Sequence, residues 1–182
     1  MKKAIIASVI AMAMGAMGSA YAANNNADAG TIDLNFQGTV SSKTCALTPV
    51  VNGKTGVMNV QLGQTNKGVK GADVEVVFKP TAESVTDCAE ATSDFVMQWE
   101  GVGSAFETKG LKASGGVATD AHVLVKATNA KTNNGAQVDK NGYQYEFAKE
   151  SVADGLKYTM NLLGGSVVGD MTAAAQVKHW YK

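Results

Sequence analysis

The last fourteen residues, Gly169–Lys182, read GDMTAAAQVKHWYK and decide the expected fold class of this chain. Every second residue back from Tyr181 forms one row, and a more polar row lies between its members. The first row is Gly169, Met171, Ala173, Ala175, Val177, His179 and Tyr181. Alternation with a period of two is typical of a strand that turns one face to a core. Because a strand at a chain end frays unless it is tied down, the sequence raises the question of what holds this one.

The same alternation recurs upstream. Strands are expected at residues 31–40, 57–62, 74–80, 94–101, 121–128, 142–148 and 155–165. Spacers rich in Gly, Asn and Lys separate them, and no segment keeps a 3.6-residue period over three turns. In the stretch 121–128, the row Ala121, Val123, Val125 and Ala127 places His122 on the outer face. Short alternating strands at roughly even spacing predict an all-β sandwich.

The beginning of the chain resembles a targeting segment. Two lysines precede a run of small and apolar residues, and Ala20-Tyr21-Ala22 follows. This order predicts a secretory signal peptide over residues 1–22. A membrane anchor is the alternative, but the apolar run is shorter than the roughly 20 residues a bilayer needs. We therefore expect an exported chain of about 160 residues, which suits one domain.

The composition limits the classes of binding partner that we expect. The chain has 16 basic and 16 acidic side chains, and every base is lysine. A near-neutral chain without arginine is not expected to bind nucleic acid, which favours basic patches and the arginine fork. Cys45 and Cys88 are the two cysteines. In an oxidising compartment an even count predicts one disulfide rather than two free thiols, worth roughly 4 kcal/mol for a loop of about 44 residues.

Catalytic chemistry is not expected. His122 and His179 are the two histidines, and neither neighbours a cysteine or carboxylate in metal-ligand spacing. The glycine-rich stretches GVGSAF and GGSVVG open no plausible helix, so they do not read as phosphate loops. The prediction is a non-enzymatic chain with no metal and no cofactor.

Three features resemble the pilin subunits of chaperone–usher fimbriae, the type 1 pilus family. In FQGTVSSKTC, a Gly follows the aromatic Phe36 by two residues and Cys45 follows it by nine. The spacing of Cys45 and Cys88 is similar to that of the family disulfide, which ties the first strand to the third. Gly169 is fourteenth from the end and Tyr181 is penultimate, as in the family's C-terminal motif. His179 departs from the family pattern, in which that position is more often apolar.

The resemblance implies an immunoglobulin-like sandwich that lacks its seventh strand. Residues 23–40 would be a donor-strand extension, and residues 41–182 the pilin domain. The donor row is Ile32, Leu34, Phe36, Gly38 and Val40. The acceptor and chaperone edge is Gly169, Met171, Ala173, Ala175, Val177, Tyr181 and Lys182, with the Lys182 carboxylate in the chaperone's basic cleft.

The family likeness further implies a structural subunit of a surface fimbria. A periplasmic chaperone would lend the missing strand and deliver the subunit to an outer-membrane usher. The donor strand of the next identical or related pilin would then replace it, and the resulting head-to-tail polymer would support cell adhesion. A shaft subunit is favoured over a two-domain adhesin. The alternative is a secreted β-sandwich that binds a host glycan or surface receptor directly, using exposed aromatics such as Tyr143 or Trp180.

Overall fold

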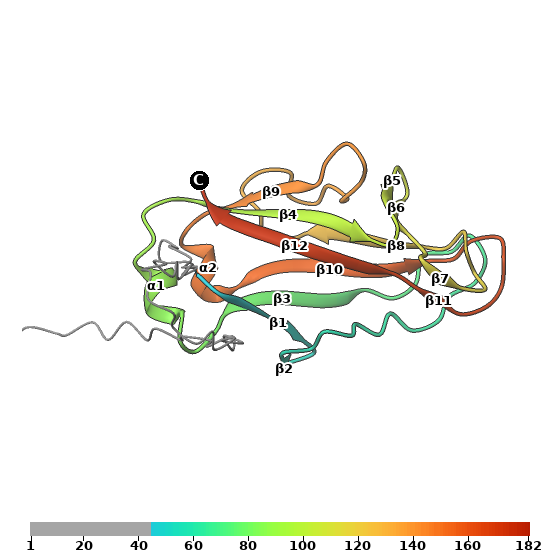
Figure 1. Ribbon diagram of the computed structural model, residues 1–182, viewed down its shortest axis with the longest axis horizontal. Helices are drawn as coiled ribbons and strands as arrows, with labels where there is room; N and C mark the ends of the chain where they lie inside the picture. The colour runs from blue at the N-terminus through green and yellow to red at the C-terminus, as the bar shows by residue number, and fades with distance from the viewer. Residues whose placement is uncertain (1–44) are drawn as a thin grey trace, which may run out of the picture. The chain divides into compact units, whose positions relative to one another are not determined.

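A computed structural model describes residues 45–182 of the chain (Figure 1). The predicted signal peptide at 1–22, the predicted donor extension at 23–40 and the start of the pilin domain at 41–44 lie outside the described residues. Within residues 45–182, the two helices are far too short to cross a bilayer.

Short strands make up most of the described body. They are β1 (Leu47–Val51), β2 (Lys54–Thr55), β3 (Val74–Pro80), β4 (Phe95–Val102), β5 (Phe106–Glu107), β6 (Gly110–Lys112), β7 (Gly115–Gly116), β8 (His122–Ala127), β9 (Gln144–Phe147), β10 (Leu156–Leu163), β11 (Met171–Thr172) and β12 (Ala174–Tyr181). The helices are α1 (Val85–Ala89) and α2 (Ser151–Asp154). The predicted all-β class is confirmed.

Two main sheets carry the fold. One runs in the order β2-β1-β3-β10-β8-β6-β5, and the other in the order β12-β4-β9. A short β11-β7 ladder forms a third, separate pairing, and every pair in the described body is antiparallel. Figure 1 shows α1, α2 and the C-terminus at one end of the strands and β7 and β11 at the other.

Tyr158 of β10 lies at the centre of the core between the sheets. Its ring centroid is 5.1 Å from that of Trp99 on β4 and 5.7 Å from that of Phe147 on β9. Burial raises the pKa of its hydroxyl far above the ordinary value. Because the inward faces of both sheets meet around this ring, the predicted sandwich is confirmed.

Five of the predicted upstream strands are present, as β3, β4, β8, β9 and β10. The strand expected at 57–62 is wrong, since this segment joins no ladder. Two members of its predicted inward row, Val60 and Leu62, pack on the core, whereas the third, Met58, is 82% exposed. The stretch lies between Gly56 and Gly63, which both have positive φ, and no described strand pairs with it.

His122 lies outside the core cluster that Val123, Val125 and Ala127 of its strand join, as the alternation predicts, yet only 6% of this residue is exposed. Its strand β8 lies between β10 and β6. The β5–β6 hairpin brings Glu107 to it, with Glu107 Oε2 3.3 Å from His122 Nε2. This contact is the main reason why the pKa of the Glu107 carboxyl is lowered. Alternation therefore predicted the strand and the row to which His122 belongs, but not its contact with the β5–β6 hairpin.

Candidate functional site: the free edge of the last strand

Strand β12 is an edge strand. It pairs with β4 from Ala174 opposite Val102 to Tyr181 opposite Phe95. On its other side, no strand of residues 45–182 pairs with it. This side therefore presents a row of backbone groups without a ladder, and such a row readily accepts an added strand.

The inward row of β11 and β12 is only half covered. Met171, Ala173, Val177 and Tyr181 pack against the core and stay partly exposed. Ala175, in the same row, is exposed. The intervening residues are exposed throughout, and they include Thr172, Ala174, Gln176, Lys178 and Trp180. The alternation predicted from the sequence is therefore present. The core-facing side chains of this edge strand are more exposed than those of the central strands.

Aromatic contacts hold the C-terminal end of β12. The ring of Tyr181 meets Phe95 edge-on at 5.2 Å, and the ring of His179 stacks on Phe95 at 5.4 Å. Burial raises the pKa of the Tyr181 hydroxyl, and the negative charge of Asp87 adds to the effect. His179 is half-buried, so a ring that can stack and hydrogen-bond suits this position better than its polarity alone suggests.

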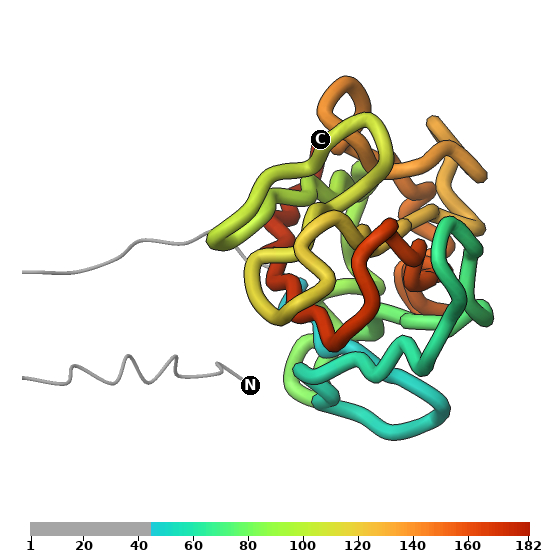
Figure 2. Tube along the Cα trace, turned by 90° about the vertical axis from the view of Figure 1, so that its right-hand side faces the viewer, coloured from blue at the N-terminus to red at the C-terminus, as the bar shows by residue number. Residues whose placement is uncertain are grey.

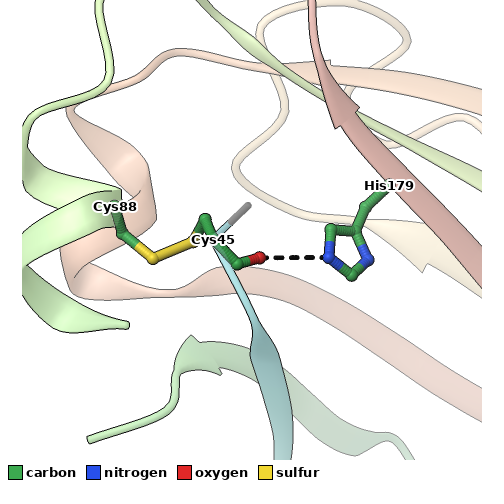
Figure 3. Close-up of a disulfide and its surroundings, with 3 residues drawn as sticks. All are labelled: Cys45, Cys88 and His179. Atoms are coloured by element: carbon green, nitrogen blue, oxygen red, sulfur yellow. Dashed lines mark hydrogen bonds between the residues drawn. A yellow bond between two sulfur atoms is a disulfide. The ribbon is translucent and has the colours of Figure 1, made fainter. Parts of the chain in front are cut away.

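His179 also connects the last strand to the start of the described body. Its Nε2 lies 3.1 Å from the backbone carbonyl oxygen of Cys45, and that oxygen accepts the hydrogen bond (Figure 3). The predicted disulfide is confirmed, since Cys45 is bonded to Cys88. Cys88 belongs to α1 rather than to a strand, so the bridge ties Cys45, two residues before β1, to the helix before β4. Together these bonds fix Cys45 beside the end of β12.

Gly169 lies at the opposite end of this edge. Its φ is +151°, which disfavours other residues, and an added Cβ would lie 2.6 Å from the Cβ of Val117. The ladder of β11 with β7 follows immediately, with Met171 opposite Gly116. The chain therefore needs glycine here to let two loops approach each other before the edge strand begins.

Sequence relatives identify the family to which the chain belongs. The chain is similar to the F107 fimbrial protein of Escherichia coli, with 33% identity over 184 residues that cover the whole of both sequences. The chain belongs to the fimbrial protein family. The fimbrial subunit is also 28% identical to the K99 fimbrial protein of Escherichia coli, over 89% of this chain and 84% of the relative. No family model matches.

Two solved pilus structures align with the chain. The P pilus rod subunit PapA aligns with 82% of this chain and 100% of its own, at a TM-score of 0.47 and 17% identity. A chain from a chaperone–usher pilus aligns with 86% of the fimbrial subunit and 99% of its own, at a TM-score of 0.39 and 18% identity. The family assignment rests on the sequence relatives, and it confirms the predicted structural, non-enzymatic class.

Ion pairs line the outward face of β12 in this fimbrial subunit. Lys178 Nζ lies 2.6 Å from Glu100 Oε2, and Gln176 Nε2 donates to the same oxygen at 2.8 Å. Lys178 is the main reason why the pKa of the Glu100 carboxyl is lowered. At the chain end, Lys182 Nζ lies 2.9 Å from Glu146 Oε2. Gln176, Lys178 and Lys182 are exposed to solvent and have ion-pair or hydrogen-bond partners. Within the described body, what β12 leaves without partners is the backbone of its free edge, and its inward row remains partly exposed.

The segment after β2 contributes apolar side chains that the sequence analysis did not assign to this site. Val57, Val60 and Leu62 are partly buried against the same core cluster as Val177 and Tyr181. They belong to a segment without strand pairing. The alternation of Met58, Val60 and Leu62 was visible in the sequence, but nothing there distinguished a strand from an unpaired stretch lying on the core.

Proposed function

We propose that this fimbrial subunit polymerises by strand donation. Residues 23–40 of one copy would add a strand to the free edge of β12 in the next copy. The observation that carries the proposal is β12 itself, which has a ladder on one side, a free edge on the other and a half-covered apolar row. Extended segments bind such edges through main-chain hydrogen bonds, while alternate side chains supply specificity.

Apolar burial and main-chain pairing would both favour this contact. Burial of Ile32, Leu34, Phe36 and Val40 would stabilise it by roughly 1.5–3 kcal/mol each, and the main-chain ladder adds to the gain. The conformational entropy lost when the donor segment becomes ordered opposes this gain. Because donor and acceptor are different surfaces of one chain, the contact does not close on itself and produces a filament.

Before assembly, the same edge would be covered by a strand of a periplasmic chaperone, which delivers the subunit to an outer-membrane usher. The support is physical: a strand edge of eight residues with an apolar row is an aggregation hazard when bare. The Lys182 carboxylate, at the end of this edge, would anchor in the chaperone. Residues 1–22 would direct the chain to that compartment.

A pair of matched variants tests the acceptor edge. Val177→Asp places a charge in the inward row, where an added strand would bury it without a partner. Gln176→Asp places the same charge on the adjacent outward position. We expect Val177→Asp to lose chaperone co-purification and fibres, and Gln176→Asp to retain both. Equal recovery of the two variants would contradict the proposed edge.

Deletion of residues 23–40 tests the donor. The truncated chain should still co-purify with the chaperone, because its acceptor edge is intact, but it should not extend fibres seen by electron microscopy. Long fibres built from the truncated chain alone would show that the donor lies elsewhere.

Glycan binding is proposed only as an added property of the fibre, because family membership does not favour a self-contained secreted module. A cavity of about 390 Å³ on the described body is lined by residues that include Tyr143, Gln98 and Asp139. Tyr143 is 43% exposed, and an exposed aromatic ring beside polar groups suits a sugar. Fibres of Tyr143→Ala should then lose cell binding while assembling normally, and unchanged binding would exclude this site.

A further inference from the structure

An exposed apolar patch lies at the end of the sandwich that carries β7 and β11. Its members are Val117, Val167 and Val168, which are 59%, 43% and 71% exposed. They belong to the loops after β7 and before β11, which Figure 2 views from this end. We call these three residues the valine patch. Neighbouring exposed apolar residues mark interaction surfaces more often than isolated ones do.

The two loops are held in place. Ala118 N donates to Asp170 O at 3.0 Å, which joins one loop to the other. The Asp120 carboxylate accepts hydrogen bonds from Ser166 N and Ser166 Oγ, both at 2.6 Å, and from Val167 N at 3.2 Å. These bonds lower the pKa of Asp120 to about 2. The patch is therefore presented by fixed backbone, as an interface requires.

The position of Cys45 indicates what covers the patch. Cys45 lies beside the C-terminal end of β12, through the hydrogen bond from His179. The chain before Cys45 is therefore attached to the described body at that end. A donor segment bound parallel to β12 would bring the next body to the same end, which already carries the attachment point of the first copy's own donor segment.

Antiparallel binding would bring the next body to the opposite end, and it matches every strand pair in the described body. The C-terminal end of the donor then lies at the start of β12, beside β11 and the valine patch. The chain from Val40 to Cys45 spans at most about 18 Å when fully extended. The body of the donating copy must therefore lie close to the patch.

The face of the donating copy that comes nearest is its Cys45 end, where Cys88 fixes α1 to Cys45. Val85 of α1 is 53% exposed. Residues 83–90 also carry three acidic side chains and no basic one. Near the valine patch, an open pocket of about 1110 Å³ is lined by three lysines, Lys67, Lys109 and Lys140, and by two carboxylates, Glu107 and Asp120. Because the lysines outnumber the carboxylates there, the two surfaces are complementary in apolarity and, by a small excess, in charge.

We propose that consecutive copies make a second contact, in which the valine patch of one copy is covered by the α1 face around Val85 of the copy that donates its strand. The proposal rests on the strand donation proposed above and adds a body-to-body interface to it. This interface would set the angle between neighbouring subunits, which a flexible connection alone could not fix.

Cross-linking tests the contact. Fibres of the Val85→Cys/Val168→Cys double variant, treated with a short bismaleimide, should give a ladder of covalent multimers. Each single variant should give none. The control is Val85→Cys/Met58→Cys, because Met58 is 82% exposed and outside the patch. A ladder from the test pair alone supports the proposal. Intact fibres without a ladder, or an equal ladder from the control, overturn it.

Electron microscopy measures assembly separately, so failure of strand donation can be distinguished from failure of the second contact. Fibres built by the chain lacking residues 23–40 would refute strand donation, whatever the cross-links show. If the double variant does not assemble, mixed fibres of the Val85→Cys and Val168→Cys single variants replace it. These should give cross-linked dimers and no longer products. Mixed fibres without dimers overturn the second contact.

Discussion

Strands β10 and β12 are both eight residues long and both alternate, yet they have different surroundings. β10 lies between β3 and β8, and Leu156 and Tyr158 of its inward row are fully buried. β12 has β4 on one side only, and Val177 and Tyr181 of its inward row stay partly exposed. A period of two therefore predicts a strand and its core-facing row, but not how many neighbours the strand has.

The largest expected effect lies in β10. Tyr158→Ala should lower the free energy of unfolding by roughly 3–5 kcal/mol, because it removes the ring on which both sheets pack. Guanidinium denaturation followed by tryptophan fluorescence measures the loss, since Trp99 lies against this ring. The matched control is Tyr143→Ala, whose side chain is 43% exposed and should cost less than about 1 kcal/mol. Similar costs for the two variants would contradict the assigned centre of the core.

A smaller and conditional effect is expected in β12. Val177→Ala should cost about 1 kcal/mol or less in the separate subunit, because the side chain is only partly buried. The cost should rise in the fibre, where the added strand would bury Val177. Denaturation of subunits and of fibres, each compared with Gln176→Ala, measures both values. An equal cost in the two states would mean that assembly leaves this row uncovered.

The smallest effect concerns the loop that joins β10 to β11. The folded-state pKa of Asp120 is about 2, below the ordinary 3.8, so its contribution to stability is complete above about pH 4 and is lost as the pH falls toward 2. Asp120→Asn should therefore be less stable than the native subunit at pH 7. This difference should shrink between pH 4 and pH 2. A pH-independent difference would contradict the role of the carboxylate.

The sequence predicted strands best where large side chains alternate in a buried row, as in Phe95, Met97 and Trp99 of β4. It missed β1, LTPVV, because five residues with a proline show no clear alternation. It missed α1 and α2 because helices of five and four residues are too short to show a period. The burial of His122 was not predictable, because Glu107, which contacts it, lies on the β5–β6 hairpin and local pattern does not encode that contact.

The candidate site divides in the same way. The inward row of β12 and the Cys45–Cys88 bridge were predictable, the first from alternation and the second from cysteine count. The contact of His179 with the Cys45 carbonyl was not, since it joins residues 134 positions apart through a ring and a backbone atom. The valine patch was not predictable either, because the exposure of a valine in a loop depends on the hydrogen bonds that fix the loop.

The bridge at Cys45 has a mechanical consequence. In a fibre held by strand donation, tension would reach each subunit through the backbone just before Cys45 and would leave through the strand bound along β12. The covalent link to Cys88 passes the pull at Cys45 into α1, so β1 is not peeled away from β3 one hydrogen bond at a time. At β12 the pull runs along the strand, so the paired positions from Ala174 to Tyr181 resist together in shear. The pull would thus act on a covalent bond at Cys45 and in shear along β12, and in neither place would hydrogen bonds break one at a time.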